Sequence, residues 1–280
     1  MQAPGPEMTD EEFLLLNEVI TAQLGISFPE HKREILASRL RPRLRELRLP
    51  RYLDYYLLLQ SDIVAERVRL TQLVTNHETY FFRETRQMDA LFGAAVADLK
   101  AKSSRPGTLS LLCAGCSSGE EAYTLALWAR EYFVDLAGTA LQIDAFDIDA
   151  GCIAQARSAI YGANSFRATS AEQRERYFSP RGPERWEVKP AYRANLRFTA
   201  GNIIDSQTFA RAVPYDVLFC RNVLIYFSEP ALHRAIDNFA QVLRPGGLLF
   251  LGAAESIIGL SSRFEVIRLG AVIAYRKVSA

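Results

Sequence analysis

The sequence is poor in cysteine and has no long apolar run, and each deficit excludes a class of protein. Its four cysteines, Cys113, Cys116, Cys152 and Cys220, are too few and too scattered for a disulfide framework. No apolar stretch approaches the roughly 18 residues that a membrane-spanning helix needs. The opening MQAPGPEMTDEE does not resemble a signal peptide. We therefore expect a cytoplasmic protein without membrane insertion.

An excess of charge of either sign is also missing. The formal net charge is +1 over 280 residues, so no overall field attracts nucleic acid, and we expect no nucleic-acid partner. About half of the residues are apolar, which is enough for a full core without a stabilising metal. We expect no metal site, a monomer, and either one large domain or two modest ones.

Residues 1–75 are predicted to form a small helical domain. Two apolar stripes at helical spacing indicate helices: Phe13, Leu16, Ile20 and Leu24, then Leu36, Leu40, Leu44 and Leu47. Thr9 with Glu12 resembles a capping box. Pro42 falls within the second stripe, so that helix either kinks or is two helices. Pro50 and Ser61-Asp62 predict further helix starts.

Residues 30–51 concentrate positive charge. Three acidic residues stand among eight basic ones, giving +5 here against −4 for the rest of the chain: Lys32, Arg33, Arg39, Arg41, Arg43, Arg45, Arg48 and Arg51, with Glu30, Glu34 and Glu46. This segment is either a solvated helix face or a docking surface for an acidic partner.

The pattern changes after a linker and connecting helix at residues 76–104. From residue 105, apolar runs predict strands at residues 109–114, 141–147, 196–200, 217–220 and 248–252. Helical segments separate most of them: residues 120–133, 149–158 and 229–243. This alternation indicates a parallel sheet covered on both faces, and residues 264–269 and 272–275 predict an antiparallel hairpin at its end. Residues 177–197 interrupt it as a loop or a small β-excursion.

A glycine-containing turn follows the first strand in residues 111–123, LLCAGCSSGEEAY. Glycines there let backbone approach a ligand at the carboxyl end of a strand. A ligand-free turn is one alternative. A dinucleotide site is a second alternative, but Ser117 and Glu120 occupy two of the three glycine positions of its motif. A P-loop is disfavoured because its lysine is missing. Cys113 and Cys116 form Cys-x-x-Cys, but a buried strand position for Cys113 disfavours redox chemistry.

Polar residues also follow other predicted strands. Asp147 stands where a carboxylate accepts ribose hydroxyls, and Asp149 is placed to cap the next helix. Arg221 and Asn222 follow another strand, although Asn222 is also a candidate helix cap. Residues 243–248, LRPGGL, predict a helix end, a turn and a new strand. Residues 75–84, TNHETYFFRE, combine polar and aromatic side chains at the domain junction.

Taken together, residues 77–84, 117–123, 146–149, 219–227 and 243–247 resemble the CheR family of chemotaxis methyltransferases over nearly the whole chain. The resemblance implies a Rossmann-like methyltransferase sheet after a helical domain, with a small β-subdomain at residues 177–197. It implies the cofactor S-adenosylmethionine, the product S-adenosylhomocysteine, and methyl esterification of glutamates on the cytoplasmic helical bundle of chemoreceptors. Residues 30–51 would suit such an acidic bundle.

The resemblance also implies roles for individual residues. The implied cofactor positions are His77, Thr79, Arg83, Glu121, Asp147, Asn202, Ile203, Arg221 and Asn222. Asp147 would bind the ribose, Asn202-Ile203 would flank the adenine, and Arg83, Arg221 and Tyr226 would serve catalysis. The family usually has Asn where this chain has His77. The 177–197 segment is slightly short, so dependence on a tethering receptor tail is not expected.

Other functions compete with this interpretation. The same fold serves enzymes that act on RNA or a small molecule, and a non-catalytic adaptor or a nucleotide-dependent oxidoreductase are further alternatives. A retained set of polar residues argues against a decayed enzyme: Arg83, Asp147, Arg221, Asn222 and Tyr226.

Overall fold

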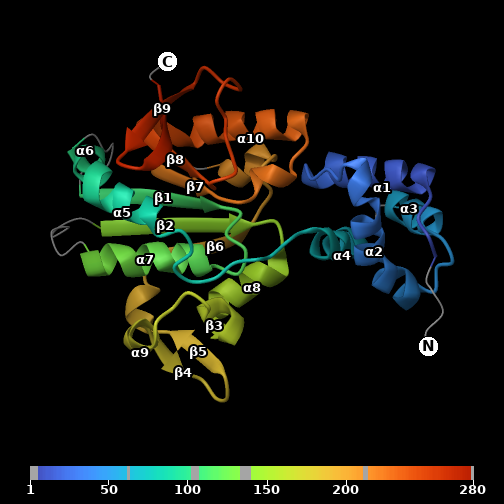
Figure 1. Cartoon of the computed structure of the whole chain (residues 1–280), viewed down its shortest axis with the longest axis horizontal. Coiled ribbons are helices and arrows are strands. Elements are labelled where there is room, and N and C mark those ends of the chain that lie inside the picture. Colours follow the sequence, from blue (N-terminus) through green and yellow to red (C-terminus); the bar gives the residue numbers. More distant parts are fainter. Residues whose placement is uncertain (1–5, 62–63, 102–106, 133–139, 211–213, 279–280) are drawn as a thin grey trace. The chain divides into compact units, whose positions relative to one another are not determined.

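The computed structural model describes residues 6–61, 64–101, 107–132, 140–210 and 214–278 (Figure 1). The chain divides into two compact units. The first holds residues 1–76 and 226–232, and the second holds residues 77–225 and 233–280. No described helix is long and apolar enough to cross a membrane.

The first unit is helical, as predicted for residues 1–75. Its elements are α1 (Asp10–Leu24), η1 (Glu30–Lys32), α2 (Arg33–Leu47), α3 (Tyr52–Gln60) and α4 (Val64–Val74). The predicted capping box is confirmed: Thr9 Oγ1 accepts from the Glu12 N–H at 3.2 Å, and Glu12 Oε2 accepts from the Thr9 N–H at 2.9 Å. Leu16, Ile20, Leu36 and Leu40 are fully buried, so both apolar stripes face the core of this unit.

Pro42 lies inside α2, which continues as one helix, so the predicted alternative of two helices is wrong. Pro42 is exposed, while Leu40 and Leu44 on either side of it are buried. Burial of both halves of the stripe keeps the helix continuous although proline removes one backbone donor.

The starts of the next two helices differ slightly from the expected positions. Helix α3 begins at Tyr52, two residues after Pro50, and Glu12 Oε1 accepts from the Leu53 N–H at 2.9 Å. Of the predicted Ser61-Asp62 start, Asp62 lies outside the described residues, and α4 begins at Val64.

Residues 226–232 belong to the first unit through backbone pairing. Ile26 and Phe227 form an antiparallel bridge. The Ser27 N–H donates to Tyr226 O and the Ser228 N–H donates to Gly25 O, both at 2.9 Å. These contacts place Tyr226 in the helical unit although it follows the last parallel-sheet motif in sequence.

The second unit is built on a seven-stranded sheet of order β6-β2-β1-β7-β8-β10-β9 (Figure 1). Its strands are β1 (Thr108–Ala114), β2 (Ala140–Asp147), β6 (Leu196–Ala200), β7 (Tyr215–Cys220), β8 (Leu243–Leu251), β9 (Phe264–Leu269) and β10 (Val272–Lys277). Strands β6, β2, β1, β7 and β8 are parallel, and β10 pairs antiparallel with β8 and β9. The predicted parallel sheet with a C-terminal hairpin is confirmed.

Helices accompany this sheet as the alternation predicted. They are α5 (Arg86–Ala90), the π-turn η2 (Leu91–Ala95), α6 (Val96–Ala101), α7 (Glu120–Tyr132), α8 (Ala150–Ser158), α9 (Ala171–Tyr177) and α10 (Glu229–Val242). The short 3-10 turns are η4 (Ala163–Phe166), η5 (Pro190–Tyr192), η6 (Ser206–Phe209) and η7 (Leu224–Tyr226). Helices α7 and α8 pack beside β2 and β6, and α6 packs beside β1.

The order of the strands fixes where a ligand can bind. From β1 the chain moves outward through β2 to β6, and it then returns to the other side of β1 at β7. Parallel sheets leave a crevice at the carboxyl ends of the strands where the direction of winding reverses. That point is the end of β1, between the ends of β2 and β7.

Two sequence expectations needed adjustment. Residues 177–197 form a β-excursion: β4 (Phe178–Pro180) and β5 (Arg185–Val188) make a small antiparallel sheet with β3 (Ile160–Gly162), which lies outside the predicted segment. The predicted turn at residues 243–248 is an irregularity within β8, where Leu243 pairs with Tyr215 and Leu248 with Val217. The helix therefore ends at Val242 and strand pairing begins at once.

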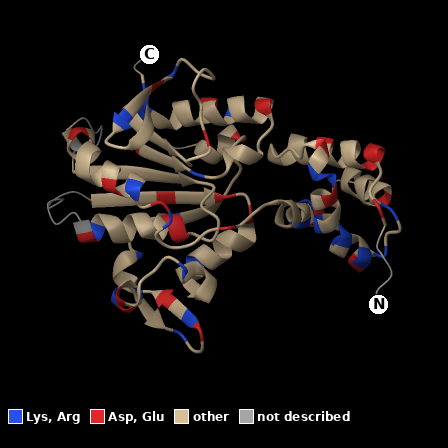
Figure 2. Cartoon of the chain, in the orientation of Figure 1, with Lys and Arg blue, Asp and Glu red and all other residues tan. Residues whose placement is uncertain are grey.

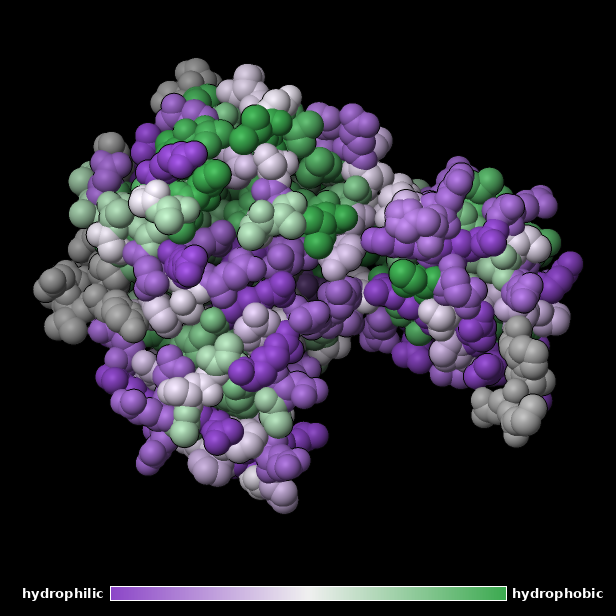
Figure 3. All heavy atoms as spheres, in the orientation of Figure 1, coloured by the Kyte–Doolittle hydropathy of each residue, from purple (hydrophilic) through white to green (hydrophobic). Residues whose placement is uncertain are grey.

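The surface is mixed in charge and hydropathy. Figure 2, in which the ribbon is coloured by residue charge, shows basic and acidic residues interspersed along α2. On the face shown in Figure 3, hydrophobic residues gather over the part of the second unit that holds β8, β9 and β10, where Val266 and Ile273 are about half exposed.

Candidate functional site

The turn between β1 and α7 brings backbone to the predicted crevice. Gly115 and Gly119 have φ of 78° and 93°, and Ser117 also has a positive φ of 49°. A Cβ on Gly115 would lie 2.6 Å from Val223 Cγ2, so only glycine fits there without movement. The turn thus packs directly against the residues that follow β7.

Asp147 ends β2 beside this turn. Its Oδ2 accepts from the Ser117 N–H at 2.7 Å, and its Oδ1 accepts from the Asp149 N–H at 2.9 Å. The side chain is buried, and burial raises the pKa of this carboxyl above its usual value. Each oxygen keeps a further acceptor position, which is what two neighbouring hydroxyl groups of a ligand require. Asp149 caps α8, as predicted, by accepting from the Gly151 N–H.

Arg221 forms the centre of a charged cluster at the end of β7. Its Nη1 donates to Glu121 Oε2 at 2.9 Å, and its Nη2 donates to Glu84 Oε2 at 3.1 Å and to Arg83 O at 2.9 Å. The side chain of Arg221 is 2% exposed. Its Nε is buried and has no hydrogen-bond partner among the described residues. Burial raises the pKa of the Glu121 carboxyl, and the charge of Arg221 opposes that shift.

Glu255 was missed by the sequence analysis. Its carboxylate accepts from five backbone N–H groups, at distances from 2.7 to 3.3 Å: those of Asn222, Val223, Leu224, Ile225 and Gly252. It thereby fixes the turn after Arg221, in which Asn222 adopts a φ of 59°. The alternative that Asn222 caps a helix is replaced by this role for Glu255. The missed signal is an acid shortly after the apolar run of β8.

The segment of residues 77–84 is anchored by its aromatic residues. Phe81 and Phe82 are buried in the core, and the Phe81 N–H donates to Ser165 O at 2.9 Å. The side chain of Arg83 is turned back on its own segment, where Nη1 donates to Glu78 O at 3.0 Å. Arg83 contacts Arg221 through its backbone oxygen, which accepts from Arg221 Nη2. Thr79 is half-buried within the same segment.

His77 lies at the start of that segment, against α8. Its Nε2 is 3.1 Å from Asp149 Oδ2, and its Nδ1 is 3.2 Å from Cys152 Sγ. Its backbone oxygen accepts from Ser117 Oγ at 3.3 Å. His77 is therefore in contact with the turn between β1 and α7.

Asn202 and Ile203 follow β6 next to the end of β2. The Gly201 N–H donates to Asp147 O at 3.0 Å, which ties the two strand ends together. The Asn202 N–H donates to Thr208 Oγ1 at 3.0 Å, and Ile203 O accepts from Asn238 Nδ2 at 2.8 Å. Ile203 is buried. This loop is held firmly beside Asp147.

Tyr226 is the predicted site residue that falls in the first unit. It belongs to the first unit, where its hydroxyl accepts from Asn76 Nδ2 at 2.9 Å. The cysteines carry no evident redox chemistry: all four are free thiols, and burial raises the pKa of Cys113 and of Cys116 well above its usual value. A thiolate, which thiol exchange needs, is therefore disfavoured at both members of the Cys-x-x-Cys.

Comparison with known proteins identifies two matching family models. Residues 11–75 match the all-alpha domain of CheR methyltransferase, and residues 77–273 match its SAM (S-adenosylmethionine) binding domain. Chemotaxis protein methyltransferase 2 of Vibrio cholerae is 32% identical over 96% of this chain and 94% of its own length. The chemotaxis protein methyltransferase of Klebsiella aerogenes is 34% identical over 92% of this chain and 87% of its own. The probable biofilm formation methyltransferase WspC of Pseudomonas putida is 36% identical over 77% of this chain and 52% of its own length.

Proposed function

Because the chain belongs to the CheR methyltransferase family and uses S-adenosylmethionine as its cofactor, we propose that it methylates glutamates of methyl-accepting chemoreceptors. The γ-carboxylate of glutamate is the acceptor, and the products are a glutamyl methyl ester and S-adenosylhomocysteine. Chemotactic adaptation is the proposed pathway, since relatives with chemotaxis names match over nearly their full length, whereas the biofilm relative matches over 52% of its own. A cytoplasmic, monomeric enzyme is part of this proposal.

The main support for the cofactor site comes from two residues at the ends of strands, Asp147 and Arg221. Asp147 retains acceptor positions for the two ribose hydroxyls after its two backbone hydrogen bonds. Arg221 retains a buried Nε donor, which a carboxylate ligand would satisfy. The residues present thus fit a ligand that carries both a ribose and a carboxylate. We assign Asn202 and Ile203 to the adenine side, because their loop is bonded to the end of β2.

The remaining predicted residues complete this assignment. His77, Thr79 and Arg83 belong to one segment that reaches the Arg221 cluster and the β1–α7 turn. Glu121 accepts a hydrogen bond from Arg221, and Asn222 is the next residue in the chain. We assign Arg83 and Arg221 to orienting a carboxylate, and Tyr226 to setting the approach of the acceptor.

In the proposed reaction, the main task of the protein is to position the acceptor carboxylate and the methyl donor. A glutamate side chain has an unperturbed pKa of about 4.3, so it is already ionised at neutral pH and needs no general base. When bound, the cofactor supplies an electrophilic methyl group on a sulfonium cation. The residues of the site must hold the acceptor oxygen in line with that methyl carbon and exclude water.

The basic residues 30–51 would supply the receptor contact. Several of their arginines are paired within the first unit, including Arg43 with Glu66 and Arg41 with Glu34. Arg45 and Arg48 have no ion pair with a described carboxylate, and both are exposed. The docking alternative therefore rests on fewer charges than the sequence count indicates.

One assay tests the proposal. The full chain is incubated with methyl-labelled S-adenosylmethionine and receptor-containing membranes, and the washed membranes are then treated with base. Release of labelled methanol identifies a carboxyl ester, whereas base-stable label or no label contradicts the proposal.

The role of Tyr226 is tested in the same assay. Tyr226→Phe is expected to lower turnover about tenfold or more. Tyr192→Phe, which removes a hydroxyl from the β-subdomain region, serves as the matched control and should leave turnover unchanged. Equal turnover of the two variants would show that the Tyr226 assignment is wrong.

A further inference from the structure

Three side chains with metal-binding groups meet beside the β1–α7 turn. His77 Nε2 lies 3.1 Å from Asp149 Oδ2, and His77 Nδ1 lies 3.2 Å from Cys152 Sγ. One ligand atom from each residue falls within 4.8 Å of the other two. Imidazole, carboxylate and thiolate are the groups that protein zinc sites use. Zinc–ligand bonds of about 2.0–2.3 Å bring ligand atoms closer together than this limit, so an ion would draw the three groups inward and bond one of the two ring nitrogens of His77.

The backbone fixes the positions of these three residues. Asp149 is the N-cap of α8 and Cys152 lies in its first turn, so both side chains are fixed by the same helix start. His77 is held against them because its backbone oxygen accepts from Ser117 Oγ. The three groups therefore come from two segments, 77 and 149–152, that the fold already joins.

The local charge favours a cation. Asp147 accepts from two backbone N–H groups, and Asp149 accepts from Gly151 N–H and contacts His77. Among the described residues, neither carboxylate forms an ion pair with lysine or arginine. Two acids whose basic neighbour is an imidazole, with no lysine or arginine paired to them among the described residues, attract a positive ion and disfavour an isolated thiolate. The thiol–imidazole–carboxylate order of a cysteine nucleophile is therefore a poorer interpretation, because an activated thiolate needs positive surroundings.

We propose that His77, Asp149 and Cys152 form a binding site for one borderline-soft divalent cation of the Zn²⁺ class. Binding forms one bond each to nitrogen, oxygen and sulfur, and the Cys152 thiol releases its proton to solvent. A fourth position remains for water or another ligand. Because the Asp149 N–H donates to Asp147, the cation would bind next to the proposed ribose acid. The site is independent of the methyl acceptor.

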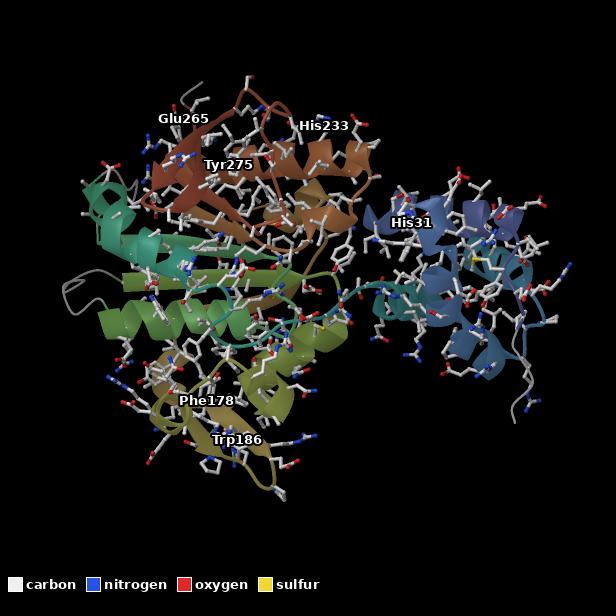
Figure 4. The ribbon with its side chains drawn as sticks, in the orientation of Figure 1. His31, Phe178, Trp186, His233, Glu265 and Tyr275 are labelled. Carbon is white, nitrogen blue, oxygen red and sulfur yellow. The ribbon has the colours of Figure 1, made fainter. Side chains whose placement is uncertain are left out.

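Zn²⁺ titration of the full chain by calorimetry tests the site. We expect one Zn²⁺ per chain, with at least tenfold weaker binding in both His77→Asn and Cys152→Ser. Co²⁺ gives a second measurement, since a thiolate ligand produces a near-ultraviolet charge-transfer band that Cys152→Ser must abolish. The matched controls are His31→Asn and His233→Asn, the other two histidines of the chain, both exposed and labelled in Figure 4.

Several outcomes would overturn the site. They are no Zn²⁺ binding by the wild type, unchanged affinity in His77→Asn or Cys152→Ser, or an equal loss in the two histidine controls. Retained cooperative unfolding shows that each variant is folded, and Cys152→Ala replaces Cys152→Ser if the latter does not fold. No step of the test uses methyl transfer, so its result is separate from that of the receptor assay.

Discussion

Glu255 Oε1 lies 2.7 Å from the backbone nitrogen of Leu224, and the same carboxylate serves four further N–H groups around Arg221. Glutamine has one oxygen in place of two, and its amide group would face N–H donors. Glu255→Gln is therefore expected to lower kcat/KM at least tenfold and to raise the KM for S-adenosylmethionine. Steady-state kinetics measures both. Glu265→Gln removes the exposed carboxylate of Glu265 (labelled in Figure 4), which pairs with Arg276, and should change neither.

Arg221 is expected to be irreplaceable by lysine. The guanidinium reaches Glu121, Glu84 and Arg83 O at once, whereas an ammonium group cannot reproduce that planar fork. We expect Arg221→Lys to lower kcat/KM by about 100-fold, which corresponds to about 2.7 kcal/mol. Arg276→Lys, at an exposed ion pair, is the control. Equal kinetics of the two variants would refute a role for the fork.

Asp147→Asn should act on cofactor binding more than on turnover. The amide nitrogen of asparagine cannot accept from Ser117 N–H or Asp149 N–H, nor from a ribose hydroxyl. We expect at least a tenfold weaker affinity for S-adenosylhomocysteine in a calorimetric titration. Asp144→Asn changes the same strand, where Asp144 Oδ2 accepts from Tyr215 OH, and should retain the wild-type affinity. A wild-type affinity for Asp147→Asn would remove Asp147 from the ribose site.

Acid should destabilise the first unit through Glu66. Its buried carboxylate accepts from Arg43 and from Tyr55 OH, and the hydrogen bonds from Arg43 are the main reason that the pKa of Glu66 is lowered. A lowered folded-state pKa stabilises the fold above the unfolded value of 4.5, and this contribution disappears as pH falls through the folded-state pKa. Urea unfolding should show Glu66→Gln less stable by about 1–3 kcal/mol near neutral pH, with a shrinking difference in acid. A difference independent of pH would exclude this linkage.

Receptor docking through residues 30–51 predicts a salt-dependent rate. Arg45→Glu should slow receptor methylation most at low ionic strength, because the Debye length shortens to about 8 Å at physiological salt. Arg185→Glu, an exposed position on β5, makes the same charge change elsewhere. If both variants behave alike, or if methylation does not depend on salt, the basic segment is a solvated face.

The sequence was most informative where a polar residue directly follows an apolar run. Asp147 and Arg221 were predicted in this way, because the end of a buried strand also marks the edge of the sheet where ligands bind. Glu255 lies shortly after β8 and not directly at its end, and four of its five N–H partners lie 30 to 33 residues earlier, so only the folded chain brings those groups around it. The contact between His77 and Cys152 is equally remote in sequence. Pro42 shows the reverse case, in which burial of the flanking leucines overrides a local helix-breaking signal.

The segment that forms the three-stranded sheet starts and finishes at neighbouring positions, which a backbone hydrogen bond joins. The Val188 N–H donates to Ala159 O at 2.9 Å, so the chain leaves α8 and returns to the same place after β3, α9, β4 and β5. A segment closed at its neck can lengthen or shorten during evolution at a small entropic cost, without moving β2 or β6. Its aromatic residues have less freedom, because Phe166 stacks on Phe81 and Phe178 meets it edge-on, with ring centroids 5.3 and 4.7 Å from that of Phe81. Descendants of this sequence should therefore vary the length of the insertion while keeping the rings that join it to residues 77–84.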